Sequence, residues 1–170
     1  MTASAATKDQ GVKKLADLIK DIQYAMLTTA LPDGTLRSRP MATQNTPFDG
    51  TLWFFTGIDS GKVDEVRGER HVNVSYADPS HNRWVSVSGT ATVVRDKAKI
   101  KELWSPPVKA WFPDGPDDPN VALLRVQVSD AEYWDAPSSK MVQAVGFVKA
   151  IVTGKPYEPG ENEKIPLGRR

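Results

Sequence analysis

The sequence predicts a β-barrel with added helices, built as one domain. Six or seven short segments rich in β-forming residues follow one another at the spacing of hairpins, with turn signals between them. Only a few segments have the composition or periodicity of helices, and there is neither an internal repeat nor a low-complexity tract. A chain of 170 residues can bury a substantial hydrophobic core. These features together indicate a mainly β fold.

The first expected element is a helix over residues 7–21. Thr7 and Gln10 have the spacing of a capping box, in which each side chain satisfies the other residue's free backbone N–H. Apolar residues then recur at helical spacing at Val12, Leu15, Leu18, Ile19 and Ile22. We expect this helix to pack its apolar face on the sheet.

The expected strands come next. A strand that includes residues 24–29 is followed by the turn signal Leu31-Pro32-Asp33-Gly34 and by a second hairpin arm over residues 35–43. Further strands are predicted at residues 51–56, 71–76, 83–94 and 121–128, with a continuation at 131–135. Short helices are predicted at residues 62–69, 97–103 and 138–145.

Two segments lie outside this regular pattern. Residues 105–120 hold five prolines around Trp111 and Phe112, which predicts a loop within the domain. The end of the chain is rich in Pro, Gly and charge, which predicts a flexible tail over residues 155–170 after a single domain over residues 1–154.

Composition excludes several kinds of site. With no cysteine, the chain has no disulfide, no Cys-ligated zinc, no iron–sulfur cluster and no thiol nucleophile. Two histidines are too few for a His-rich metal site. A net charge of +1 gives no global attraction to nucleic acid or to a membrane, so any anion site must be local. No long apolar run or signal peptide is seen, and a cytoplasmic protein is the default expectation.

The most informative stretch runs from Leu36 to Lys62. Arg37 and Arg39 are two residues apart on a predicted strand, so both project from the same face. Two guanidinium groups on one face need an anion between them. That anion is either a ligand or a carboxylate from elsewhere in the chain, and the local sequence leaves both interpretations open. Pro40 cannot donate to a sheet ladder, which predicts an edge or a bulge.

The second half of this stretch ends at a predicted helix start. Thr56, Ser60 and Lys62 could combine hydroxyls, an ammonium group and free backbone N–H groups into a phosphate site. The competing interpretation is plain helix capping by Asp59 or Ser60. Asp59 would have to point away from any phosphate.

Other features are less specific. Trp104, Trp111 and Trp134 lie near predicted loops or strand ends, where they could form core, an aromatic wall or a subunit interface. No Walker A, G-x-G-x-x-G or G-x-S-x-G motif and no catalytic triad is found. The basic residues of the helix over residues 62–69 are balanced by Glu65 and Glu69, which predicts a solvated face rather than a nucleic-acid patch.

The order of these motifs resembles a known family. The residues that carry the resemblance are Met26-Leu27-Thr28-Thr29, Asp33-Gly34-Thr35-Leu36-Arg37-Ser38-Arg39-Pro40-Met41-Ala42, Leu52-Trp53-Phe54-Phe55-Thr56, Ser60-Gly61-Lys62 and Glu132-Tyr133-Trp134-Asp135. Their spacing is similar to that of the general stress protein 26 family. This family is part of the FMN-binding split-barrel superfamily of pyridoxamine 5′-phosphate oxidases, and the resemblance covers residues 11–154.

The resemblance implies a six-stranded antiparallel split β-barrel and a homodimer with FMN in the groove between subunits. The second subunit would supply Trp134. By position, the residues implied to contact the cofactor are Arg37, Ser38, Arg39, Pro40, Met41, Ala42, Phe55, Thr56, Ser60, Lys62, Trp84 and Trp134. Within this set, Ser60 and Lys62 would hold the phosphate, and the strand from Arg37 to Ala42 would line the flavin.

The chain also departs from the oxidases. The oxidases carry Lys at the position of Ala42 and Arg at the position of Gly61. They also carry cationic substrate ligands in the stretch where this chain has Lys140-Met141-Val142 and Ala144. These differences argue against pyridoxamine phosphate oxidation. Three hypotheses remain: an FMN-binding protein of general-stress type, an FMN- or deazaflavin-dependent oxidoreductase with another substrate, and a non-enzymatic flavin carrier or sensor that acts through a protein partner.

Overall fold

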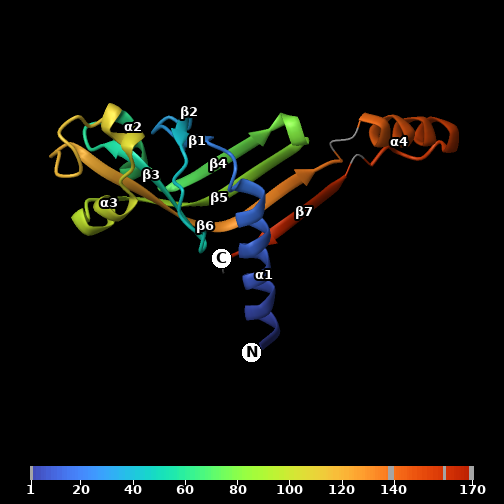
Figure 1. Ribbon diagram of the computed structural model, residues 1–170, viewed down its shortest axis with the longest axis horizontal. Coiled ribbons are helices and arrows are strands. Elements are labelled where there is room, and N and C mark those ends of the chain that lie inside the picture. The colour runs from blue at the N-terminus through green and yellow to red at the C-terminus, as the bar shows by residue number, and fades with distance from the viewer. Residues whose placement is uncertain (1, 138–139, 159, 169–170) are drawn as a thin grey trace.

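The computed structural model describes residues 2–137, 140–158 and 160–168. Its centre is an antiparallel sheet that curls into a half-barrel, with strand order β2-β1-β4-β5-β6-β3 and with β7 also paired to β6 (Figure 1). β2 and β3 therefore form the two edges of the curled path. The antiparallel split barrel expected from the sequence is confirmed.

The elements agree closely with those expected from the turn signals. In chain order they are α1 (Thr2–Ile19), β1 (Tyr24–Ala30), β2 (Leu36–Ala42), β3 (Thr51–Gly57), α2 (Gly61–Gly68), β4 (His71–Asp78), the 3₁₀ turn η1 (Pro79–His81), β5 (Arg83–Val94), α3 (Lys97–Leu103), the 3₁₀ helix η2 (Pro106–Ala110), β6 (Val121–Asp135), α4 (Lys140–Thr153) and β7 (Glu161–Pro166).

Helix α1 begins earlier than the capping box predicts. It starts at Thr2 and ends at Ile19, so Thr7 lies inside the helix and is not its cap. The segment before Thr7 contains three alanines, which have the highest helix propensity and allow the helix to continue toward the N-terminus. Leu15, Leu18 and Ile19 are buried against the sheet, as the apolar periodicity predicts.

Strand β6 is long enough to pair with two strands along one edge. Its residues 121–127 pair with β3, and its residues 130–135 pair with β7. The sequence analysis assigns residues 155–170 to a flexible tail. That assignment is wrong for Glu161–Pro166, which forms a paired strand with Ile165 buried in the core. Ile165 is the one buried residue of this strand, so hydrophobic periodicity cannot reveal it.

A register shift separates the two halves of the β5–β6 ladder at Ser88 and Gly89. A Cβ on Gly89 would collide with the backbone carbonyl of Gln127. The bulge therefore requires glycine because another backbone comes too close for a side chain, as the small residues of this strand predict.

The interior is divided into two hydrophobic clusters. The main core lies between α1 and the sheet and is centred on buried residues such as Leu27, Phe54 and Val87. The second cluster lies under α3 and η2, where Ile100, Val108 and Phe112 meet the start of β6. The proline-rich segment is thus not a plain loop, because it folds around a core of its own.

Only one face of the central sheet is covered by helix α1. The opposite face, which we call the bare face, is formed by alternate residues of β2, β1, β4, β5 and β6. It includes Tyr24, Met26, Trp84 and Trp134, which are 65%, 40%, 42% and 42% exposed. Large apolar side chains on the open face of a sheet indicate an interaction surface.

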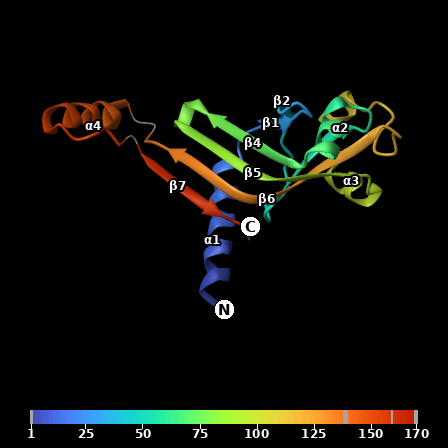
Figure 2. The same cartoon turned by 180° about the vertical axis from the view of Figure 1, so that it is seen from behind.

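Helix α4 stands apart from the half-barrel, beyond the end of the β6–β7 ribbon (Figures 1 and 2). The short helix predicted at residues 138–145 falls partly outside the described residues, and within them α4 continues to Thr153. Within the described ranges, no helix is both long and apolar enough to cross a membrane.

Candidate phosphate and flavin site

The β1–β2 hairpin places both arginines on one face, as their spacing predicts. Arg37 lies opposite Thr29, and Arg39 lies opposite Leu27. Asp33 closes the turn by accepting a hydrogen bond from the backbone N–H of Thr35. β2 is an edge strand, which explains why Pro40 is tolerated in it.

Glu65 of α2 is the anion between the two arginines. Its Oε1 accepts from Arg37 Nη1 at 2.9 Å and its Oε2 from Arg39 Nη2 at 2.6 Å. The Thr29 hydroxyl donates to Glu65 Oε2 at 2.5 Å and accepts from Arg39 Nη1 at 2.6 Å. A carboxylate from elsewhere in the chain, one of the two interpretations left open by the sequence, is therefore present.

The side chain of Glu65 is only 9% exposed, so the solvated face predicted from the composition of this helix is wrong for that residue. Burial by itself raises the pKa of the Glu65 carboxyl. The hydrogen bonds from Thr29 and Arg39 and the charges of both arginines outweigh that effect, and they hold the pKa below its usual value. Sequence reasoning missed this role because the partner arginines lie 26 and 28 residues away.

The predicted phosphate residues do come together at the junction of β3 and α2. The Thr56 hydroxyl shares a hydrogen bond with the Ser60 hydroxyl at 2.9 Å and accepts one from Lys62 Nζ at 3.2 Å. Ser60 is the N-cap of α2, yet its side chain makes no capping hydrogen bond within the described residues. The competing interpretation, helix capping by the Ser60 side chain, is therefore wrong, and Asp59 is exposed.

Lys62 is a cation held in an unfavourable position. Its pKa is lowered, mainly by burial and then by the nearby charge of Arg39, against the opposing effect of Glu65. Within the described ranges, Lys62 forms no ion pair with a carboxylate. A partly buried ammonium group beside a guanidinium and a helix N-terminus favours an anion at this position.

Other predicted contact residues lie on different faces. Met41 is buried in the main core. Ser38, Pro40 and Ala42 alternate with it and lie on the bare face, where the Ser38 hydroxyl meets Thr28 at 2.7 Å. The Phe55 ring packs edge-on against Trp104 in the second cluster, 5.7 Å between centroids, so its side chain points away from Thr56.

Trp84 and Trp134 are opposite each other in the β5–β6 ladder. With Tyr24 and Met26 they line a hollow of about 260 Å³ on the bare face. In the ladder, Trp84 pairs with Ala77 of β4. Measured along the strands, this position is four residues or more from Thr29, so Trp84 and Thr29 are separated by on the order of 15 Å. Within one chain, the two tryptophans therefore do not join the Lys62 cluster.

The remaining aromatic residues divide between core and surface. Trp104 is part of the second cluster, whereas Trp111 is 80% exposed.

A larger hollow of about 320 Å³, which sequence reasoning missed, lies between α1, residues 43–48 and β3. Tyr76 lines it, and burial raises the pKa of its phenol. In the described part of the chain no cluster of His, Asp and Glu could hold a metal.

Comparison with known proteins identifies the family. The model of the family described as pyridoxamine 5′-phosphate oxidase like matches residues 10–158, which is most of the chain. The chain belongs to this pyridoxamine 5′-phosphate oxidase-like family. The resemblance noted from the motifs, to its general stress protein 26 branch, is confirmed.

Three relatives illustrate this membership. Protein bli-3 of Neurospora crassa is 33% identical over 158 residues, covering 87% of this chain and 76% of its own. A structure described as general stress protein 26 from Jannaschia sp. CCS1 has a TM-score of 0.72 at 22% identity, covering 94% of this chain and 99% of its own, and shows the shared fold. The general stress FMN/FAD binding protein of Xanthomonas citri has a TM-score of 0.65 at 30% identity, covering 75% of this chain and 89% of its own.

Proposed function

We propose that this protein binds FMN and that Thr56, Ser60 and Lys62 hold its phosphate. The observation that carries the proposal is the position of Lys62, whose ammonium group lies 3.2 Å from the Thr56 hydroxyl, beside the positive charge of Arg39, and has no carboxylate partner among the described residues. A phosphate would remove this repulsion and would accept from the ammonium group, from both hydroxyls and from the start of α2.

The arginines have a different part in this proposal. Arg39 is 16% exposed and bound to Glu65 and Thr29, so it fixes the position of α2 and adds positive potential at Lys62. Arg37 is 58% exposed and has donors left for a ligand. The residues present fit a phosphorylated ligand, because the helix start is open at Gly61, where the oxidases carry Arg. A Cβ added to Gly61 would meet no neighbouring atom within 4 Å.

The isoalloxazine ring needs apolar walls, and Trp84 and Trp134 supply them on the bare face. Because these residues are remote from the Lys62 cluster in one chain, we infer a homodimer in which the second copy's tryptophan at position 134 reaches the flavin. The name of the Xanthomonas citri relative, an FMN/FAD binding protein, supports a flavin but does not distinguish FMN from FAD.

A bound flavin would supply electron and hydride transfer without a catalytic side chain. In that case the residues of this chain bind and orient the cofactor, and the substrate of an oxidoreductase would be selected at the edge of the ring. The substitutions at Ala42 and Gly61 favour a reaction other than pyridoxamine phosphate oxidation.

Titration with three ligands tests the phosphate site. FMN, FAD and riboflavin are added separately to the purified protein, and flavin fluorescence and the visible spectrum are recorded. We expect FMN to bind at least about tenfold more tightly than riboflavin, which has the same ring but no phosphate, because the phosphate adds charge-assisted contacts. Equal affinity for FMN and riboflavin, or no binding of either, would refute the proposal.

Reduction separates an enzyme from a carrier. NADH or NADPH should bleach the bound flavin if the protein is an oxidoreductase that uses them. The alternative, a flavin carrier or sensor, is favoured by Trp111, which the folded segment 105–120 leaves 80% exposed. Trp111→Ala should then abolish capture of a protein partner and leave FMN binding unchanged.

A further inference from the structure

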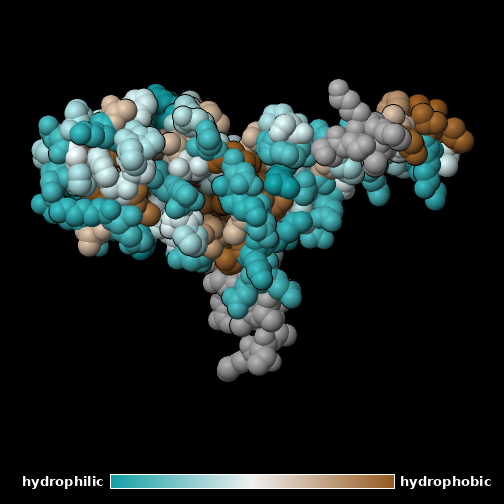
Figure 3. All heavy atoms as spheres, viewed as in Figure 1, coloured by the Kyte–Doolittle hydropathy of each residue, from teal (hydrophilic) through white to brown (hydrophobic). Residues whose placement is uncertain are grey.

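Helix α4 presents its apolar side to solvent instead of to its own chain. Its exposed apolar residues lie at helical spacing along one stripe: Val145, Phe147, Val148, Ile151 and Val152, between 56% and 78% exposed. At one border of the stripe, Gly146 packs on the ring of Tyr157 and Phe147 meets the same ring edge-on. Brown atoms mark α4 as a concentrated apolar region in Figure 3.

The chain itself supplies little to cover this stripe. Within the described residues α4 packs on its flanking loops, with Tyr157 on one side and with a hydrogen bond from Gln143 to the Pro137 carbonyl at 2.7 Å on the other. The five exposed side chains present on the order of 400 Å² of apolar surface, which is as large as the largest patch on an ordinary monomer. A surface of this kind indicates a protein interface.

The same molecule carries a matching uncovered surface. The bare face has Tyr24, Met26, Trp84 and Trp134 around its 260 Å³ hollow, and no helix of the described chain covers it. α4 is the next element after β6, whose last residues bear Trp134, so the helix and the bare face lie on consecutive elements. An antiparallel sheet can leave one face to water, but such a face is normally polar, so the large apolar side chains of the bare face indicate that another surface covers it.

We propose that α4 of one copy docks on the bare face of a second copy, so that each subunit of a homodimer clasps the other. The contact is reciprocal, because each copy has one helix and one bare face, and a two-fold arrangement closes without leaving either exposed. If each stripe on the order of 400 Å² covers an equal area of the opposite face, the two contacts bury roughly 1,600 Å², which is the size of a standard interface. The inference rests on the homodimer of the proposed function. It assigns the part of the bare face around Tyr24 and Met26 to α4 and leaves Trp84 and Trp134 beside it to the flavin.

Charge favours a protein surface over a membrane as the occupant. Helix α4 carries two charged residues, Lys140 and Lys149, which are nine positions apart in the sequence. Between Thr153 and Gly168, two lysines are outnumbered by Glu158, Glu161 and Glu163. This arm therefore lacks the cluster of basic residues that attracts an anionic lipid surface.

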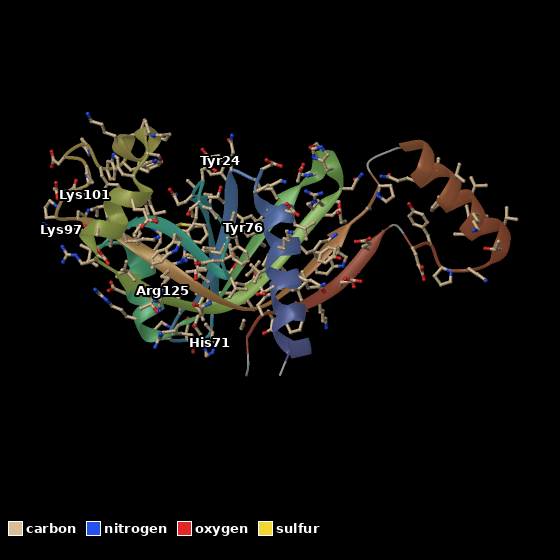
Figure 4. All side chains as sticks on the ribbon, turned by 60° about the horizontal axis from the view of Figure 1, so that its bottom comes forward. Tyr24, His71, Tyr76, Lys97, Lys101 and Arg125 are labelled. Atoms are coloured by element: carbon tan, nitrogen blue, oxygen red, sulfur yellow. The ribbon has the colours of Figure 1, made fainter. Side chains whose placement is uncertain are left out.

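Cross-linking tests the contact, and the absence of cysteine in the chain makes introduced thiols unique. Val148→Cys and Met26→Cys chains are co-expressed and treated with a short bis-maleimide. We expect a cross-linked pair containing one chain of each kind. A matched control uses Lys101→Cys in place of Met26→Cys. Lys101 lies on α3, at the opposite end of the molecule from α4 (Figure 4), so this combination should give no cross-linked pair.

Two further measurements make the result decisive. Val148→Glu should raise the dimer dissociation constant, measured by sedimentation, at least about tenfold, because the substitution buries a charge in the contact. Lys149→Glu, on the neighbouring side of the helix, is the matched control and should change this constant by less than about threefold. Three results would overturn the proposal. The first is a cross-link that forms only between two Val148→Cys chains, and the second is a dimer dissociation constant that Val148→Glu leaves unchanged. The third is flotation of the wild-type protein with phosphatidylserine-containing vesicles that Val148→Glu abolishes.

The flavin spectrum of the wild-type protein separates the two proposals, because Met26 lines the same hollow as the flavin-wall tryptophans and its substitution changes that hollow. A mixed cross-link together with no FMN binding by the wild-type protein would leave the α4 contact standing and refute the proposed function. FMN binding by a dimer that gives no mixed cross-link would refute the α4 contact alone.

Discussion

Replacement of Glu65 by Ala should cost the protein a large part of its stability. The carboxylate is 9% exposed and ties α2 to β1 and β2 through Thr29, Arg37 and Arg39. Loss of the charge-assisted bond to Arg39, which is 16% exposed, costs about 2 kcal/mol. The buried Thr29 hydroxyl loses its acceptor at about 1 kcal/mol, and the exposed Arg37 pair adds at most about 0.5 kcal/mol.

The sum is about 3 kcal/mol, close to the range found when one partner of a buried ion pair is removed. For a chain of this size the midpoint of thermal unfolding should fall by roughly 6–12 °C. Chemical and thermal denaturation monitored by circular dichroism measure both values. Asp64→Ala is the matched control, since Asp64 is the preceding residue of the same helix but its pair with Arg67 is exposed.

The effect should also depend on pH. Because the pKa of Glu65 is lowered in the folded protein, its contribution is fully present above the unfolded pKa of about 4.3 and is lost as the pH falls through the folded pKa. The stability gap between wild type and Glu65→Ala should therefore close in acid. If Glu65→Ala and Asp64→Ala destabilise the protein equally at about pH 7, well above that pKa, the Glu65 network does not hold α2 in place.

Three other substitutions address the site and the sheet. Lys62→Ala should weaken FMN binding by roughly 1–3 kcal/mol through loss of a charge-assisted contact, whereas the control Lys97→Ala on α3 should leave the FMN titration unchanged. If Lys62→Ala and the wild type bind FMN with equal affinity, Lys62 is not part of the phosphate site. Trp134→Ala should lower FMN affinity and restore flavin fluorescence with little change in unfolding midpoint, because the side chain is 42% exposed, and an unchanged titration would argue against it as a flavin wall. Gly89→Ala should destabilise the fold by about 1–3 kcal/mol, because its Cβ would meet the Gln127 carbonyl, whereas Gly61→Ala, with no neighbouring atom within 4 Å, should be much milder, as urea denaturation can measure.

Local sequence patterns were sufficient for most of the fold. Alternation along residues 83–94 predicts a strand with one buried face, and the structure has that strand with the same bounds. Turn chemistry at Pro32 and Gly34 predicts the β1–β2 hairpin, because these residues adopt turn conformations that a strand cannot. The short strand β7 could not be predicted, since four of its first five residues are exposed and its stability comes from pairing with β6.

The candidate site likewise combines contacts that the sequence predicts with contacts that only the tertiary structure reveals. The sequence by itself determined that Arg37 and Arg39 share a face and that Thr56, Ser60 and Lys62 meet at a helix start, because strand and turn geometry fix neighbours that are close along the chain. Only the tertiary structure decided that Glu65 neutralises the arginines and that Lys62 has no carboxylate partner among the described residues. Such contacts depend on how the sheet curls and where α2 packs, and no local pattern encodes which distant side chains that packing brings together.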